Sequence, residues 1–306
     1  MTTIPDPAPA ALRAARAAHP GKRERDLAKI LGVSEGALLA ADVGREAVAI
    51  AADPARLLPL LAPLGEVLAL TRNESAVHEC VGRYAHWDPA AGHVSGPGLD
   101  LRILAAHWVH AFAVERPGEA GPRRSVQVFD AAGEAVHKVH LRPASDAGAF
   151  AALREALRRP EQAEALAPAP AAPGVAGGGV AGGGVAGGWA AEGEAGGTPL
   201  APAAVTAVLE AAAAQGLPLA VVAGNAGAVQ AFSGPVHRIV AMGPWINVLD
   251  PGFDLHLRQD HVADLRLAEG WLTARDGAGA PVLRIGPGVG ADPAGWAALL
   301  AALPRP

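Results

Sequence analysis

The stretch LGEVLALTRNESAVHECVGRY, residues 64–84, decides the fold class. It holds short runs of strand-favouring residues with partial alternation on both sides of a polar turn, which is typical of β-strands bounded by turn residues. The same pattern returns in GPGLDLRILAAHWVHAFAVE (96–115) and in RRSVQVFDAAGEAVHKVHL (123–141). The three stretches therefore predict several antiparallel strands.

Helical periodicity flanks these strands. Apolar residues three and four apart predict helices within residues 10–41 and a further short helix at 54–63. Residues 144–166 predict a closing helix that is N-capped by Ser145 or Asp146. Helices leading into antiparallel strands indicate an α+β protein.

The segment 10–41 also admits a DNA-binding helix-turn-helix. Such a motif needs a basic recognition helix, but residues 35–46 carry a single cation, Arg45, against three carboxylates. We therefore expect a packing helical hairpin.

The second part of the chain repeats the first. Three pairs of identical residues lie 152 residues apart. The motifs LDLRI (99–103) and FDLHL (253–257) lie 154 residues apart, and so do His107 and His261. The pairs at offset 152 are Asn73 with Asn225, Val77 with Val229, and Gly82 with Gly234. Nearly constant offsets indicate two related copies of one domain. The predicted fold is α+β, with two tandem halves that each hold a large antiparallel β-sheet and helices.

A stretch of different composition separates the two halves. Residues 167–199 repeat GVAGG units with few side chains to bury, so we expect a Gly-, Ala- and Pro-rich linker. A phosphate-binding loop is not indicated, because neither a preceding strand nor a following Gly-Lys-Ser/Thr motif is present. The predicted domains are residues 1–166, the linker 167–199, and a shortened C-terminal repeat over 200–306.

Composition excludes several classes of protein. The 306 residues carry a net charge of −5, which gives no general attraction to nucleic acid. The single cysteine, Cys80, excludes an internal disulfide framework and a cysteine-clustered metal site. The first 30 residues lack the basic start and apolar block of a secretory signal, and no apolar run reaches about 18 residues. We expect a cytoplasmic protein without membrane insertion.

The residues alone assign no catalytic group. His107 with His110, and His137 with His140, are spaced i, i+3, which points to opposite faces of a strand and argues against a shared metal. Neither a zinc-protease motif nor a serine-hydrolase motif occurs. Cys80 follows His78 by two residues, and we expect a buried structural thiol rather than a nucleophile.

The three strand-rich stretches, taken in order, closely resemble the bacterial hemin transport and degradation proteins of the HemS, ChuS and HmuS type. PGKRERDLAKILGVSEGALLAADVG (20–44) is similar to the helical start of that family, and VVAGNAGAVQAFSGPVHRIVAMGPWINVLDPGFDLHL (221–257) resembles its second half. The resemblance covers roughly residues 19–160 and 200–275. It implies a cytoplasmic protein that binds heme after import, and some members are reported to open the heme ring with a reductant.

The resemblance also implies three site residues. Arg102 occupies the position of a heme-contacting arginine, and a planar guanidinium suits a propionate carboxylate. His78 matches a candidate ligand of the heme iron, and His93 matches a glycine-flanked histidine that would contact the cofactor. The alternatives are an ordinary strand arginine paired with Asp100 and two structural histidines.

One departure from the family stands out. Its second half normally carries the axial histidine about seven residues after a tryptophan, but Trp189 is followed by no histidine before His237, and Ala226 replaces the arginine of a GNRG turn. Three alternatives stay open: another donor drawn from the histidines, Cys80, Tyr84 or Met242; a working site in the first half; or a partner protein of a heme importer that binds no heme. The residues favour a carrier role, and reductant-dependent heme degradation stays open as an additional activity. Implied partners are a heme importer, a heme acceptor and, as an open alternative, a second copy of the chain.

Overall fold

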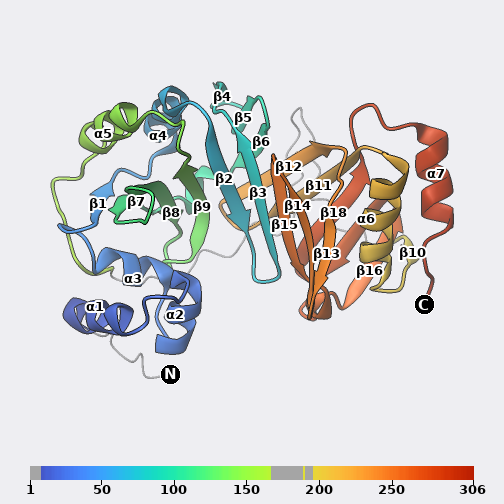
Figure 1. The fold of residues 1–306 in the computed structure, drawn as a ribbon, viewed down its shortest axis with the longest axis horizontal. Coiled ribbons are helices and arrows are strands. Elements are labelled where there is room, and N and C mark those ends of the chain that lie inside the picture. Colours follow the sequence, from blue (N-terminus) through green and yellow to red (C-terminus); the bar gives the residue numbers. More distant parts are fainter. Residues whose placement is uncertain (1–7, 167–188, 190–195) are drawn as a thin grey trace. The chain divides into compact units, whose positions relative to one another are not determined.

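The computed structural model describes residues 8–166, Trp189 and residues 196–306, so most of the predicted linker lies outside the described residues. The chain divides into two compact units, the first drawn from residues 1–67 and 104–174 and the second from residues 68–103 and 175–306. Within the described residues, the strands belong to two antiparallel sheets of nine strands each, accompanied by a few helices (Figure 1). The α+β prediction is confirmed.

Unit 1 combines helices with four adjacent strands in the order β1-β7-β8-β9. Phe112 and Phe129 meet edge to face in its core, with ring centroids 5.9 Å apart. The described elements are α1 (Pro9–Ala18), α2 (Glu24–Leu31), α3 (Glu35–Ala40), β1 (Ala47–Ile50), α4 (Pro54–Leu61), η1 (Ala62–Leu64), η2 (Ala105–His107), β7 (His110–Arg116), β8 (Arg123–Phe129), β9 (Ala135–Leu141) and α5 (Ala147–Ala156).

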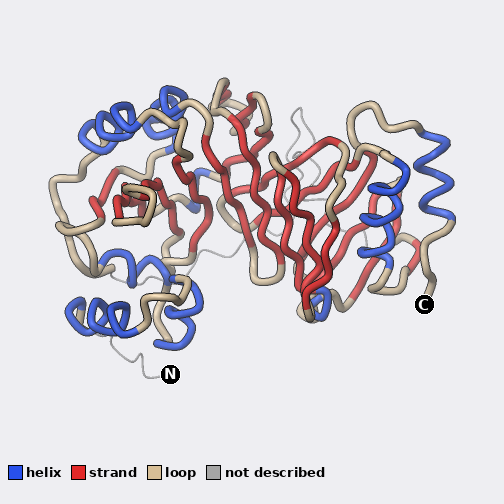
Figure 2. The backbone as a smooth tube through the Cα atoms, viewed as in Figure 1, coloured by secondary structure: helices blue, strands red, loops and turns tan. Residues whose placement is uncertain are grey.

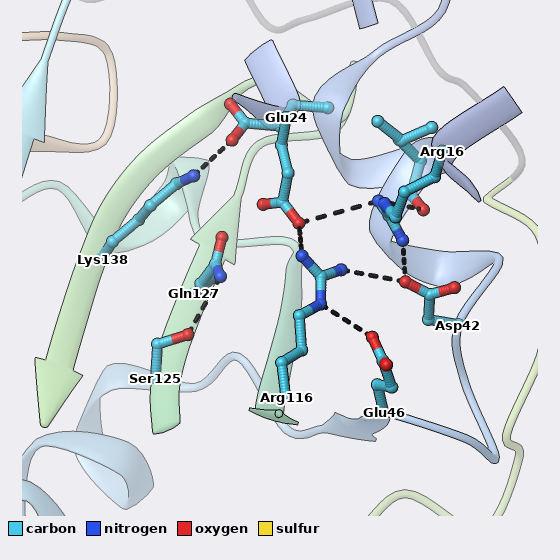
Figure 3. Close-up of polar contacts among 10 residues, drawn as sticks. Arg16, Glu24, Asp42, Glu46, Arg116, Ser125, Gln127 and Lys138 are labelled. Atoms are coloured by element: carbon cyan, nitrogen blue, oxygen red, sulfur yellow. Dashed lines mark hydrogen bonds and ion pairs between the residues drawn. The ribbon is translucent and has the colours of Figure 1, made fainter. Parts of the chain in front are cut away.

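An ionic network ties the N-terminal helices to β7. Arg116 bonds to Glu24, to Asp42 at 2.9 Å and to Glu46 at 3.0 Å, and Arg16 of α1 reaches the same carboxylates of Glu24 and Asp42 (Figure 3). These ion pairs therefore hold the N-terminal helices against β7 within the unit.

The closing helix is shorter than predicted. It begins as expected, because Asp146 Oδ1 accepts a hydrogen bond from the Ala149 amide at 2.9 Å. It ends at Ala156 rather than at 166, because the next residues pair with β1: Ile50 forms a bridge with Arg158, and the Arg159 amide donates to Ala49 at 3.0 Å. Pro160 follows and cannot continue a helix.

Unit 2 consists mainly of strands, with α6 and α7 beside them (Figure 2). Its strands run in two orders, β2-β3-β15-β14-β13 and β10-β16-β17-β18-β11-β12-β6-β5-β4. The described elements are β2 (Val67–Arg72), β3 (Ala76–Gly82), β4 (His86–Asp88), β5 (His93–Gly96), β6 (Leu99–Ile103), β10 (Thr198–Pro199), α6 (Ala204–Gln215), β11 (Leu219–Gly224), β12 (Ala228–Gly234), β13 (Ile239–Met242), β14 (Trp245–Asp250), β15 (Phe253–Arg258), η4 (Gln259–His261), β16 (Asp264–Ala268), β17 (Trp271–Arg275), β18 (Pro281–Pro287) and α7 (Pro293–Ala301).

The two sequence repeats exchange strands inside unit 2. Strand β6 of the first repeat pairs with β12 of the second, so Arg102 faces Val229, while β15 of the second pairs with β3 of the first, so His256 faces Val77. The offsets found in the sequence convert one pairing into the other. The internal repeat is therefore present in the register of the strands, and the exchange itself was not predicted.

The repeated asparagines mark the centre of this exchange. Asn73 Oδ1 accepts hydrogen bonds from the amides of Ser75 and Ala76, and Asn225 Oδ1 accepts the equivalent bonds from Gly227 and Ala228. Their side-chain amides are also exchanged: Asn73 donates to the Gly224 carbonyl at 3.1 Å, and Asn225 to the Arg72 carbonyl at 2.8 Å. Each asparagine thus closes its own turn and also bonds to the residue just before the turn of the other repeat.

None of the helices in the described part of the chain is long and apolar enough to cross a membrane.

The predicted domain boundaries at 166 and 200 follow the sequence repeat, whereas the compact units follow contacts, so these boundaries stay a prediction.

Candidate functional site: an arginine–tryptophan face in unit 2

One face of the longer strand array in unit 2 gathers groups from six strands. Across β6, β12, β11, β18 and β17, the register places Asp100, Ala231, Val222, Arg284 and Thr273 in one row. In the next row, β5, β6 and β12 align His93, Arg102 and Val229. Directly paired residues of antiparallel strands share a face, and so do residues two apart on one strand. Both arginines therefore lie on the same side of this sheet, which we call the Arg102 face.

The centre of the Arg102 face is apolar. Val222, Val229 and Ala231 form a buried cluster, and Trp189 and Trp271 pack against it. Glycines let the indoles lie against the strands: a Cβ on Gly224 would stand 3.0 Å from the Trp189 ring, and one on Gly286 would overlap the ring of Trp271. We call this buried cluster of small side chains, with the two indoles packed against it, the platform.

The two arginines border this platform. Arg102 is 1 % exposed, and its Nη1 donates to the Ala91 carbonyl. Arg284 is 7 % exposed, and its guanidinium carbon lies 5.1 Å from the centroid of the Trp271 ring, a cation–π contact. A guanidinium offers five N–H donors in a plane and suits carboxylates.

A buried hydroxyl completes the face. Thr273 is 5 % exposed, and its Oγ1 makes no hydrogen bond to any part of the chain that the structure describes. A buried polar atom without a partner is destabilising, and it is satisfied when a polar ligand arrives. Cationic donors, an apolar platform and this hydroxyl together fit a flat apolar molecule that carries carboxylates.

His93 lies on this face beside Arg102. Its Nε2 is 2.9 Å from Asp100 Oδ1, and the side chain is 19 % exposed. The structure therefore brings together two of the three residues that the sequence singled out, Arg102 and His93.

His78 lies elsewhere, in the core of unit 2. It is fully buried on β3, its Nε2 is 3.1 Å from the Val221 carbonyl, and its Nδ1 is 3.9 Å from Cys80 Sγ. Burial lowers the pKa of His78 to about 4. Iron ligation by His78 stays a prediction, and it would require these contacts to break.

The other donors considered from the sequence are placed as follows. Burial raises the pKa of the Cys80 thiol to about 12, so this sulfur is a thiol at neutral pH, and it raises the pKa of the buried Tyr84 as well. Met242 is 63 % exposed at the end of β13. In unit 1, His137 stacks on Trp108, and burial lowers the pKa of His137 to about 3. His107 lies in η2 rather than in a strand.

The repeat provides a counterpart of the Arg102 face with different chemistry. On β3, β14 and β15 the equivalent positions hold His256 for Arg102, Asn247 for His93 and Glu79 for Ala231. His256 Nδ1 lies 2.7 Å from Asn247 Oδ1, and its Nε2 lies 4.0 Å from Glu79. We call this the His256 face; its carboxylate takes the place of a methyl group and disfavours an anionic ligand.

Sequence reasoning missed Arg284, Trp271 and Thr273. The only local signal is that Arg284 alternates with Leu283 and Ile285 in an otherwise apolar strand. Alternation shows that Arg284 opposes these residues, but it does not show which strands lie beside it.

Comparisons with known proteins agree with this fold. A family model described as the haemin-degrading HemS/ChuX domain matches residues 32–157 and 186–278. The hemin transport protein HmuS of Yersinia pestis is 33 % identical over 288 residues, which cover 85 % of this chain and 82 % of the relative. The hemin transport protein HemS of Yersinia enterocolitica is 32 % identical over the same shares.

Solved structures extend the likeness to three dimensions. The holo form of PhuS, a heme-binding protein from Pseudomonas aeruginosa, is 34 % identical with a TM-score of 0.84, and covers 98 % of this chain and 100 % of its own. The heme-degrading enzyme ChuS of Escherichia coli O157:H7 shares the fold, with a TM-score of 0.78 over 96 % of this chain and 97 % of its own, at 24 % identity. Since the family model and the relatives match most of its length, the chain belongs to the family of haemin-degrading HemS/ChuX domain proteins.

Proposed function

We propose that this protein binds heme on the Arg102 face and carries it to an acceptor. The observation that supports this proposal most is the placement of two nearly buried arginines, Arg102 and Arg284, at the border of one apolar platform. Its relatives are named as hemin transport and heme-binding proteins, which favours the same ligand.

The chemistry of heme matches the chemistry of this face. Heme is a flat apolar ring with two propionates and an iron that accepts axial donors. The valines and indoles would exclude water from the ring, while the guanidinium groups would pair with propionates through charge-assisted hydrogen bonds. Thr273 would supply a further polar contact.

The test is an absorbance titration of the purified protein with hemin and with iron-free protoporphyrin IX. Leucine at Arg102 or Arg284 removes a charge-assisted bond, so we expect each variant to lose roughly 1–3 kcal/mol of binding free energy for both ligands. The matched control is Arg258→Leu, because Arg258 stacks over Trp245 at 5.4 Å on the other strand array. Unchanged affinity in both leucine variants, or an equal loss of affinity in the control, would show that heme does not bind on the Arg102 face.

The route of the heme is part of the proposal. We infer a cytoplasmic carrier that receives heme from an importer and delivers it to another protein, as the names of the transport relatives suggest. Hemin-loaded protein mixed with an apo-globin should pass its heme to the globin. The rate of heme transfer between this protein and its importer or acceptor should exceed the rate to the globin only if the two proteins form a complex. The alternative is an importer partner that binds no heme. It predicts importer binding with no saturable hemin titration. The protein could also form a homodimer, and analytical ultracentrifugation measures its oligomeric state.

Heme degradation is a second candidate, favoured by the description of the matching family as haemin-degrading. Ring opening requires electrons and dioxygen from outside the protein, and the protein would supply a shielded site for the ring. Loaded protein mixed with ascorbate in air should lose its Soret band and release iron if this activity is present. A Soret band that is stable under these conditions would contradict heme degradation and leave heme transport as the proposed function.

A further inference from the structure

The sequence between Trp189 and His237 holds no histidine, so a histidine that ligated the iron of a bound heme would come from another part of the chain. Two histidines share the Arg102 face in the described part of unit 2. The register aligns His93 with Arg102, and it places His86 opposite Ser95, which faces Asp100. Both histidines therefore point to the side where the arginines lie.

We propose that His93 is the axial ligand of the heme iron and that Asp100 is the positioning residue that fixes its ring. This inference rests on the proposed function, since it names the donor used at the same face. It is carried by the contact of 2.9 Å between His93 Nε2 and Asp100 Oδ1, by the alignment of His93 with Arg102, and by the partial exposure of the ring.

The carboxylate determines which nitrogen is the donor. An ionised carboxylate only accepts hydrogen bonds, so the contact places the imidazole proton on Nε2. The lone pair of a neutral ring then lies on Nδ1. Histidines that ligate metals usually donate their other N–H to a carboxylate or carbonyl, which fixes the ring and makes it a stronger donor. The His93–Asp100 pair has this arrangement before any ligand binds.

His86 and His78 lack this arrangement in different ways. His86 is exposed on the edge strand β4, and in the described structure no carboxylate is bonded to its ring. His78 is enclosed in the core, where its Nε2 meets the Val221 carbonyl. His93 alone among these three combines a carboxylate partner, partial exposure and a place beside Arg102.

The test compares His93→Ala and Asp100→Asn with the wild-type protein, with His86→Ala as the matched control. Each protein is titrated with hemin and with iron-free protoporphyrin IX, and the ferric complexes are examined by absorbance and electron paramagnetic resonance. For hemin we expect His93→Ala to bind at least about tenfold more weakly and to lose the histidine-ligated spectrum, with a loss of roughly tenfold for Asp100→Asn. Affinity for protoporphyrin should stay near wild type in both. Imidazole added to His93→Ala should restore the histidine-ligated spectrum, which a purely structural role would not produce.

The outcomes separate this inference from the proposed function. A wild-type protein that binds neither ligand overturns the proposed function. Wild-type binding of both ligands, with an unchanged hemin spectrum in His93→Ala, overturns the assignment of His93 and keeps the face. Equal loss of both ligands in His93→Ala also contradicts ligation, because protoporphyrin has no iron. An altered hemin spectrum in His86→Ala would move the assignment to that residue.

Discussion

Single residues of unit 2 show that the face of the sheet on which a side chain lies sets its chemistry, because His78 and Arg102 are both almost fully buried. His78 and Arg102 both lie on strands of the first repeat, yet His78 is enclosed with its Nε2 at a carbonyl, while Arg102 borders the platform. The resemblance singles out Arg102 and His93 one by one, but only the pairing of β5 with β6 shows that they share a face. The sequence could not predict the partnership with Arg284, which depends on strands that are far apart in the chain.

The buried His78 makes the stability of the fold depend on pH. The unfolded His78 side chain takes up a proton near the ordinary histidine pKa of 6.5, whereas the folded one does so only at about 4. The unfolded state therefore binds more protons between these values, so folding stability is fully present above about pH 6.5 and falls as the pH drops toward 4. Between these two pH values the unfolding free energy of His78→Gln should fall by roughly 3 kcal/mol less than that of the wild-type protein. Urea unfolding at both pH values measures the difference, and parallel pH curves would contradict it.

The second residue-scale prediction concerns Gly286. A methyl group there overlaps the Trp271 ring, so Gly286→Ala should displace the indole, destabilise the fold by roughly 1–3 kcal/mol and weaken protoporphyrin binding. Gly277→Ala is the control in the same hairpin, because its Cβ would meet nothing within 4 Å. Wild-type binding and stability in Gly286→Ala would show that Trp271 does not need its present position.

At the scale of elements, the exchange of strands between the repeats is the feature that the sequence did not reveal. Alternation predicts β6 and β12 separately, because burial of one side of a strand is written in the local pattern. It does not predict that β6 pairs with β12, because many apolar strands could pair equally well by pattern alone. The repeated asparagines contribute the specificity, through side-chain bonds to backbone groups of both repeats.

These asparagines give an element-scale prediction. Asn225→Ala removes the turn bonds to Gly227 and Ala228 and the bond to the Arg72 carbonyl, so we expect a loss of about 1–3 kcal/mol in unfolding free energy. Asn73→Ala should lose a similar amount. Because the two side chains close adjacent turns, the double variant should depart from additivity by at least about 0.5 kcal/mol. Strict additivity would show that the two turns are energetically independent.

At the scale of the whole molecule, duplication has produced two equivalent sheet faces with opposite chemistry. Arg102, His93 and Ala231 on one correspond to His256, Asn247 and Glu79 on the other. Partial burial also raises the pKa of Asp254, the counterpart of Asp100 on the His256 face. The repeat was predictable from the sequence, but the division of chemistry between its copies needed the register. We expect one hemin per chain, and His256→Ala should leave this stoichiometry unchanged.

The most direct measurement is a crystal structure of the hemin complex, with X-ray data collected above the iron absorption edge to locate the metal. We expect a single iron peak on the Arg102 face, with the ring over Val222, Val229 and Ala231 and the propionates directed to Arg102 and Arg284. An iron peak on the His256 face, or beside a displaced His78, would show that heme binds elsewhere.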